Sequence, residues 1–303
     1  MSIRSAAPAT GTGTAPAGPA EAPPRSPSRP RRRPRVNWWL TALLAACSLT
    51  VLVPLYFTVV TALKKPAELA GAGFDLPQDP QWGNFAEAWR LTGYPQAALN
   101  SALITVGAVL LTLLTNSMVA YAIARNMDRR LFKGLYFFFV SALFIPFPII
   151  MLPVIKQTSM LGLDNQAGLI FLYVVYGLAF NIFLYVGYIK SIPRALEEAA
   201  RTDGAGTWTV FWKVIFPLLT PMNATVGILT FLWAWNDFLL PLVILSSPSA
   251  RTLPLAQYVF QNQFSSDYTT AFASYLMALA PVLLVYLFAQ RWIISGVLRG
   301  AVK

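Results

Sequence analysis

The stretch GLIFLYVVYGLAFNIFLYVGYI, residues 168–189, contains no Asp, Glu, Lys or Arg and decides the fold class of this chain. A helix needs about 20 mostly apolar residues to cross the hydrocarbon core of a bilayer. Inside that core every backbone N–H and C=O must be satisfied within the protein, so an uninterrupted apolar run must be helical. We therefore expect residues 168–189 to form a transmembrane helix. The alternative, a core helix of a large soluble protein, is disfavoured because such helices rarely lack a polar face.

Similar runs recur along the whole chain. Its residues are 56% hydrophobic and only 12% charged, whereas soluble domains usually carry about 25% charged residues. The six predicted spans are Trp38–Leu63, Leu103–Ala124, Leu135–Ile155, Gly168–Ile189, Pro221–Ser246 and Thr269–Ala289. Asp237 is the single charged residue within them. The sequence thus predicts an all-α integral membrane protein with six transmembrane helices.

The basic residues are distributed unevenly between the two sides of this topology. If the N-terminus lies inside, the internal segments carry 18 of the 23 Lys and Arg residues and the external segments carry five. Such a positive-inside bias sets the orientation of a membrane protein. We expect a multi-pass protein of the plasma (cytoplasmic) membrane with both termini in the cytoplasm. The net charge of +11 is explained by topology, so no nucleic-acid ligand is predicted.

Two regions of different composition divide the chain. Residues 1–36 are rich in Pro, Ala, Ser, Gly and Arg, and such a segment cannot bury enough apolar surface to offset its ordering entropy. We expect a disordered, basic cytoplasmic tail over residues 1–36 and a transmembrane domain over residues 37–303. Cys47 is the single cysteine, which excludes an intrachain disulfide. Because the apolar run continues past Cys47, a lipoprotein cleavage site there is disfavoured.

The internal segment over residues 190–220 carries the strongest functional signal. It begins KSIPRALEEAARTDGAG, residues 190–206. Pro193 suits the first turn of a helix, the residues after it are strong helix formers, and Gly204 permits the positive φ that ends a helix. Small residues on this short helix would let another surface approach its backbone closely. By physics alone, it could dock a cytoplasmic partner or lie on the lipid headgroups.

Residues 198–217 resemble the signature of permeases from binding-protein-dependent ABC importers. That signature reads Glu-Ala-Ala, three residues, Gly, nine residues, then Ile-x-Leu-Pro. The matching residues are Glu198, Ala199, Ala200, Gly204 and Pro217, to which Asp203 and Ala205 add further likeness. Val214 and Phe216 replace the usual Ile and Leu and remain apolar. Residues 235–238, 252–255 and the C-terminal residues 290–303 look like the carbohydrate importers of this family, and the ending and small size are similar to the maltose-type second permease subunit.

The resemblance implies a type I ABC importer permease that moves a sugar or oligosaccharide. It also implies three kinds of partner: a homologous second permease, a cytoplasmic ABC ATPase dimer and an extracytoplasmic sugar-binding protein. By this likeness the seven residues of the signature region would couple the permease to the ATPase. ATP binding on the other chains would then bias the spans between inside-facing and outside-facing states.

Several chemistries lack their usual residues. The sequence has no Walker A phosphate loop and no His, so we expect no ATP binding by this chain, no enzymatic activity, no metal and no cofactor. An ion-coupled secondary transporter is the alternative, but it would need ionisable groups near the midplane. Asp237 alone qualifies. With Trp235, Asn236 and the nearby Trp233 it could form a polar patch on the substrate pathway, or it could make a structural hydrogen bond between helices.

Overall fold

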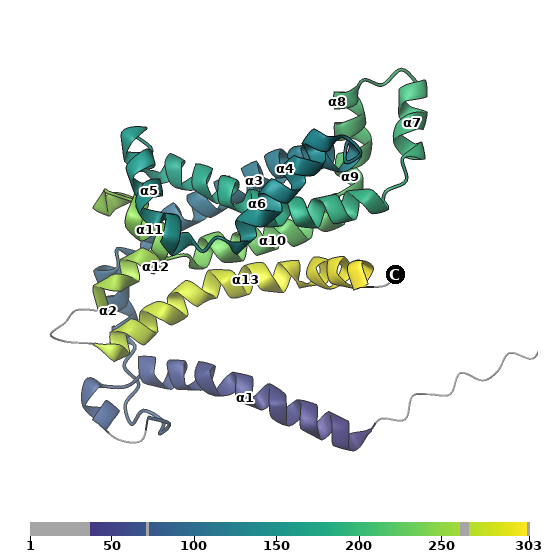
Figure 1. Ribbon diagram of the computed structural model, residues 1–303. Coiled ribbons are helices and arrows are strands. Elements are labelled where there is room, and N and C mark those ends of the chain that lie inside the picture. Colours follow the sequence, from purple (N-terminus) through teal and green to yellow (C-terminus); the bar gives the residue numbers. More distant parts are fainter. Residues whose placement is uncertain (1–36, 71–72, 261–266, 302–303) are drawn as a thin grey trace, which may run out of the picture. The chain divides into compact units, whose positions relative to one another are not determined.

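The computed structural model describes residues 37–70, 73–260 and 267–301, so the predicted tail over residues 1–36 lies outside it. The chain divides into two compact units, Met1–Leu49 and Thr50–Lys303. Helix α1 (Trp38–Ala62) crosses the boundary between them. The remaining α-helices are α2 (Gly83–Leu91), α3 (Tyr94–Arg125), α4 (Arg130–Ser141), α5 (Phe147–Met160), α6 (Gln166–Ser191), α7 (Ala195–Thr202), α8 (Thr207–Val210), α9 (Phe216–Leu218), α10 (Thr220–Asn236), α11 (Leu239–Ile244), α12 (Leu253–Ala256) and α13 (Tyr268–Ala301) (Figure 1). Short 3₁₀ segments are η1 (Pro66–Ala70), η2 (Ala142–Phe144), η4 (Pro248–Ala250) and η5 (Gln257–Phe260), and η3 (Phe211–Ile215) is a π-helix.

Four helices of the described chain are long and apolar enough to cross a membrane. They are Trp38–Ala62, Tyr94–Arg125, Gln166–Ser191 and Tyr268–Phe288. Two further pairs of helices pass the same criterion together, but each pair is sharply bent. The structure therefore has four to six candidate spans, and the all-helical membrane fold predicted from the apolar runs is confirmed.

The third predicted span is not one continuous helix, which corrects the expectation for residues 135–155. α4 and η2 end at Phe144, α5 begins at Phe147, and the two parts are bent by 107°. Ile145 has an extended ψ of 106°, the conformation that a residue before proline prefers. Pro146 follows at the N-cap of α5, and a second proline lies in its first turn. The chain breaks here because proline removes a backbone donor and clashes with the preceding turn.

The fifth predicted span also ends early. α10 stops at Asn236, and Asp237 is extended with ψ 130° before α11 begins at Leu239. Residues 221–246 are thus two helices rather than one. At its other end, α10 is bent by 75° from the helical run Thr207–Leu218.

The core of the second unit is built on α3, which packs along α6 and α10. Buried small residues line α3, among them Ala108, Ser117, Ala120 and Ala124. Small side chains let membrane helices approach closely, and the resulting van der Waals contacts hold them together without a hydrophobic driving force. One apolar cluster, which includes Ile189 and Ile215, lies near α7 and α8 at one end of this bundle. A second cluster joins α3 and α6 to α11.

The segments singled out in the sequence lie at opposite ends of the bundle. α7 and α8 lie side by side at the end of α6, whereas α11 and α12 lie at the far end of α10 (Figure 1). The segment around α12 is tied to α3 by polar contacts. The Asn100 side chain donates to the Ser249 and Arg251 carbonyls at 2.8 and 2.9 Å, and the Ser101 hydroxyl accepts from the Leu253 N–H at 2.7 Å.

Candidate functional site

The short helix α7 is closed at its C-terminus by backbone hydrogen bonds. Gly204 has φ +86°, its N–H donates to the Arg201 carbonyl at 3.0 Å, and the Ala205 N–H donates to the Ala200 carbonyl at 3.0 Å. This pair of bonds defines a Schellman motif, which satisfies two otherwise unpaired carbonyls. The predicted positive φ at Gly204 is therefore confirmed. Acidic residues in the first turn and Arg201 in the last turn complement the helix dipole.

The predicted coupling residues fall on two sides of α7 and beyond it. Glu198, Ala199, Asp203 and Gly204 are exposed, whereas Ala200 and Ala205 are half-buried against the apolar cluster beneath α7. The structure thus gathers six of the seven signature-region residues at one short segment. Their contact with an ATPase stays a prediction.

Pro217 lies apart from these six, in α9 after the π-helix Phe211–Ile215. The Phe216 N–H donates to the Phe211 carbonyl, five residues back. Such wide turns accommodate irregularities in a helix and are frequent at functional sites. The helical run that begins at Thr207 thus continues past Pro217 and ends at Leu218.

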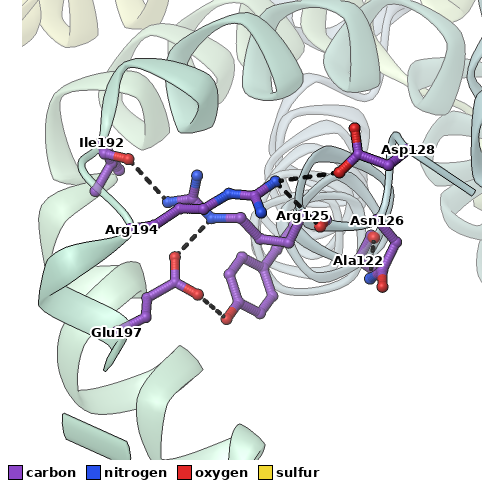
Figure 2. A network of polar contacts seen from close by, with 8 residues as sticks. Ala122, Arg125, Asn126, Asp128, Ile192, Arg194 and Glu197 are labelled. Atoms are coloured by element: carbon purple, nitrogen blue, oxygen red, sulfur yellow. Dashed lines mark hydrogen bonds and ion pairs between the residues drawn. The ribbon is translucent and has the colours of Figure 1, made fainter. Parts of the chain in front are cut away.

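A buried ionic cluster that the sequence pattern does not predict fastens α7 to α3 (Figure 2). The Arg125 Nε donates to Glu197 Oε1 at 2.6 Å, and the Tyr121 hydroxyl donates to Glu197 Oε2 at 2.7 Å. The side chains of Glu197 and Arg125 are only 8% and 12% exposed to solvent. Glu197 precedes Ala200 by three residues, so both lie on the inward face of α7. That spacing is the one signal in the sequence that could have identified Glu197.

Asp237 lies between the end of α10 and the start of α11, and its side chain also reaches α6. Its Oδ2 accepts a hydrogen bond from the Tyr173 hydroxyl at 3.1 Å, and its Oδ1 accepts from the Leu239 N–H at 3.0 Å. The side chain therefore caps α11 and contacts α6 at the same time. Among the other predicted pathway residues, Trp235 is buried and stacks on Phe231, and Asn236 is exposed. The structure does not bring the three predicted residues to one surface, and their pathway role stays a prediction.

A cavity of about 300 Å³ lies between α6 and α10, one turn away from Asp237 along α10. It is lined by Tyr176, Gly177, Phe180, Asn181, Leu229, Thr230 and Trp233. Asn181 is 3% exposed, and its Nδ2 has no hydrogen-bond partner within the described residues. A side chain on Gly177 would bring its Cβ within 2.9 Å of that nitrogen. The cavity thus combines aromatic rings with an unpaired amide donor, which suits a small polar ligand with apolar faces.

Comparison with known proteins identifies the chain's relatives. Residues 116–299 match the family described as binding-protein-dependent transport system inner membrane component. The chain is 42% identical to the multiple sugar-binding transport system permease protein MsmG of Streptococcus mutans, over 90% of this chain and 100% of that protein. It is 31% identical to the melibiose/raffinose/stachyose import permease protein MelC of Bacillus subtilis, over 87% of this chain and 96% of that protein.

Solved structures agree with the sequence relatives. A chain of a bacterial ABC transporter involved in the import of the acidic polysaccharide alginate superposes with a TM-score of 0.72 at 25% identity, covering 88% of this chain and 99% of that one. The inward-facing MetNI methionine ABC transporter matches with a TM-score of 0.53 at 17% identity, which concerns the fold alone. The family match over most of the transmembrane domain and the identity to full-length permeases lead to one conclusion: this chain belongs to the inner membrane components of binding-protein-dependent transport systems.

Proposed function

We propose that this chain is a permease subunit of an ATP-driven importer of a sugar or oligosaccharide. The observation that carries the proposal is the 42% identity to MsmG, a sugar-system permease, over 100% of that protein's length. The permease MelC supports the same substrate class. Membership of a binding-protein-dependent family implies a solute-binding protein and an ATPase as partners. We propose further that a homologous second permease completes the membrane path and that two ATPase copies bind on the cytoplasmic side, where both termini lie.

The coupling surface of this proposal is the exposed side of α7. Glu198, Ala199, Asp203 and Gly204 present two carboxylates and two small residues there. A cleft in the ATPase could approach the small residues closely while a basic side chain pairs with a carboxylate.

The sugar path of this proposal passes the cavity between α6 and α10. The flat rings of Trp233 and Tyr176 can cover the apolar face of a pyranose, and the Asn181 amide can donate to a sugar hydroxyl. A pathway site needs only modest affinity, since it must also release the sugar. When the ATPase closes on ATP, it would draw the coupling segments together. The cavity would then change from being open to one side of the membrane to being open to the other.

Reconstitution of the full importer tests the proposal. The chain is co-expressed with a permease, an ATPase and a binding protein encoded by neighbouring genes, and the purified complex is reconstituted in liposomes. Melibiose, raffinose and stachyose serve as a first panel, chosen from the name of MelC. We expect ATP-dependent uptake of a sugar that also stimulates ATP hydrolysis. Uptake that needs no ATP and follows a proton gradient would contradict the proposal and favour an ion-coupled secondary transporter.

A further inference from the structure

Two adjacent glutamates of α7 have opposite environments. Glu198 is exposed, whereas Glu197 is 6% exposed and turned toward α3. A buried carboxylate is costly unless it is paired and hydrogen-bonded. Glu197 meets both conditions, because both of its oxygens accept a hydrogen bond from α3. Arg125 donates to Oε1, and Tyr121 donates to Oε2. We call Tyr121, Arg125 and Glu197 the anchor cluster.

The anchor cluster also holds the chain that leads into α7. The Arg125 Nη2 donates to the Ile192 carbonyl at 3.1 Å, and the Arg194 Nη2 donates to the Arg125 carbonyl at 3.4 Å (Figure 2). That carbonyl lies at the C-terminus of α3, where helix carbonyls lack partners within the helix. The C-terminal end of α3 is thus bonded to three residues of the following segment. Ile192 and Arg194 precede α7, and Glu197 lies in the first turn of α7.

Directional bonds are needed here because α7 is short. It has eight residues, and its backbone packs against α8 and the π-helix. Apolar contacts alone let a short helix slide or rotate, whereas a buried, fully bonded ion pair has one favourable geometry. α3 in turn packs along α6 and α10, the two helices that line the cavity. A displacement of α7 is therefore transmitted through the anchor cluster to α3 and then to the cavity walls.

We propose that Glu197 is a positioning residue that locks α7 to α3 through Arg125 and Tyr121, so that movement of the ATPase reaches the sugar path. This inference rests on the proposed function. It assigns the two glutamates different tasks: Glu198 faces the partner, and Glu197 transmits the motion. Loss of the anchor cluster leaves an importer that assembles and hydrolyses ATP but moves less sugar for each ATP consumed.

The test uses the reconstituted full complex and the variants Glu197→Gln, Arg125→Gln and their double combination. Tyr121→Phe removes a single hydroxyl and is the mildest variant, which keeps the test informative if the others insert poorly. Glu87→Gln is the matched control, because it makes the same chemical change on α2, at a glutamate whose ion pair with Arg90 lies outside both the coupling surface and the anchor cluster. Two quantities are measured: sugar transported per ATP, with the melibiose, raffinose and stachyose panel, and the rate of trypsin cleavage after Arg194 and Arg201.

We expect Glu197→Gln to lower sugar per ATP by roughly fivefold. The effects of Glu197→Gln and Arg125→Gln should be less than additive in the double variant, because both break the Arg125–Glu197 ion pair and differ only in their other bonds, to Tyr121 and to the Ile192 carbonyl. Cleavage after Arg194 and Arg201 should accelerate roughly fivefold in Glu197→Gln and stay unchanged in Glu87→Gln, since a loosened helix opens more often. Wild-type cleavage and wild-type sugar per ATP in Glu197→Gln would overturn the inference, as would additive effects of the two single variants. If no sugar stimulates the wild-type complex, the proposed function fails, and the cleavage rates still decide whether the anchor cluster holds α7.

Discussion

The hydroxyl of Tyr173 donates to the carboxylate of Asp237 at 3.1 Å, so the end of α10 is fastened to α6. The same carboxylate caps α11 through the Leu239 N–H. The ring of Tyr173 also meets Trp233 edge to face, with centroids 5.1 Å apart. The one charged side chain in the predicted spans is thereby linked through Tyr173 to the wall of the cavity.

Asp237→Asn is expected to keep uptake within about twofold of wild type. Asn retains oxygen and nitrogen atoms that can serve both Tyr173 and the Leu239 N–H. Asp237→Leu removes both bonds and leaves a buried Tyr173 hydroxyl unpaired, at a cost of about 1–3 kcal/mol. Uptake and thermal stability of the purified complex are measured for both. Proton-coupled uptake that Asp237→Asn abolishes would contradict the ATP-driven mechanism.

Gly204→Ala is expected to weaken coupling through the backbone. The φ of +86° costs a residue with a Cβ about 1 kcal/mol, and the Schellman closure of α7 is the structure that it disturbs. Gly206→Ala is the matched control, because Gly206 has φ −70° and equally open space around it. The readouts are sugar-stimulated ATP hydrolysis and the amount of ATPase that co-purifies. Equal behaviour of the two alanine variants would show that the shape of this turn has no role in docking.

Trp233→Ala is expected to reduce sugar uptake about tenfold while basal ATP hydrolysis stays near wild type. Loss of one stacking aromatic ring removes about 1 kcal/mol or more of contact with a passing sugar. Phe171→Ala serves for comparison, since Phe171 is an exposed aromatic residue on α6 that does not line the cavity. An unchanged uptake rate in Trp233→Ala, or an equal loss in Phe171→Ala, would place the sugar path elsewhere.

The orientation is tested with single cysteines introduced after replacement of Cys47. A cysteine at the exposed position Thr202 is expected to resist an impermeant thiol reagent in intact cells and to react after permeabilisation. A cysteine at the exposed position Gln78 is expected to react in intact cells. Strong labelling of position 202 in intact cells would reverse the proposed topology.

Asp267 makes the N-terminus of α13 sensitive to acid. Partial burial raises the pKa of its carboxyl, but hydrogen bonds from Thr270 and Thr269 outweigh that effect and hold the pKa below its usual range. A lowered folded-state pKa gives stability that is present above the unfolded value of about 3.9 and is lost as the pH falls through the folded value. Asp267→Ala should cost about 1 kcal/mol at neutral pH. Thermal unfolding of the wild type and this variant in detergent should converge only below about pH 4. A constant difference between them across that range would refute the cap.

The sequence located the membrane segments because apolar runs without charge leave few alternatives. It did not reveal the breaks near Pro146 and Asp237. Prolines occur within membrane helices, where neighbouring groups satisfy the freed carbonyls, so Pro146 alone does not distinguish a break from a kink. Asp237 has the residue type of a helix cap, but its second bond is to Tyr173, 64 residues earlier in the chain, and the local sequence does not show that contact.

The signature residues on α7 could be found by their spacing, and the anchor cluster could not. Glu197 and Glu198 are the same amino acid at adjacent positions, and both suit the first turn of a helix. Which of them is buried depends on the rotation of α7 about its axis. That rotation is set by Arg125 and Tyr121, more than 70 residues earlier. The cavity was missed for a similar reason, because Asn181 and Trp233 meet only when α6 and α10 pack together.

The π-helix Phe211–Ile215 makes the hairpin formed by α7 and α8 sensitive to residue number as well as residue type. Each residue added to or removed from a regular α-helix turns everything beyond it by about 100°. A one-residue deletion in the wide turn would leave the apolar composition intact and change the phase between α8 and α10. Trp208 and its neighbours would then point in a different direction. A change in the number of these π-helix residues would therefore misalign the proposed transmission from ATPase to sugar path even if the buried Phe211 and Ile215 were both kept.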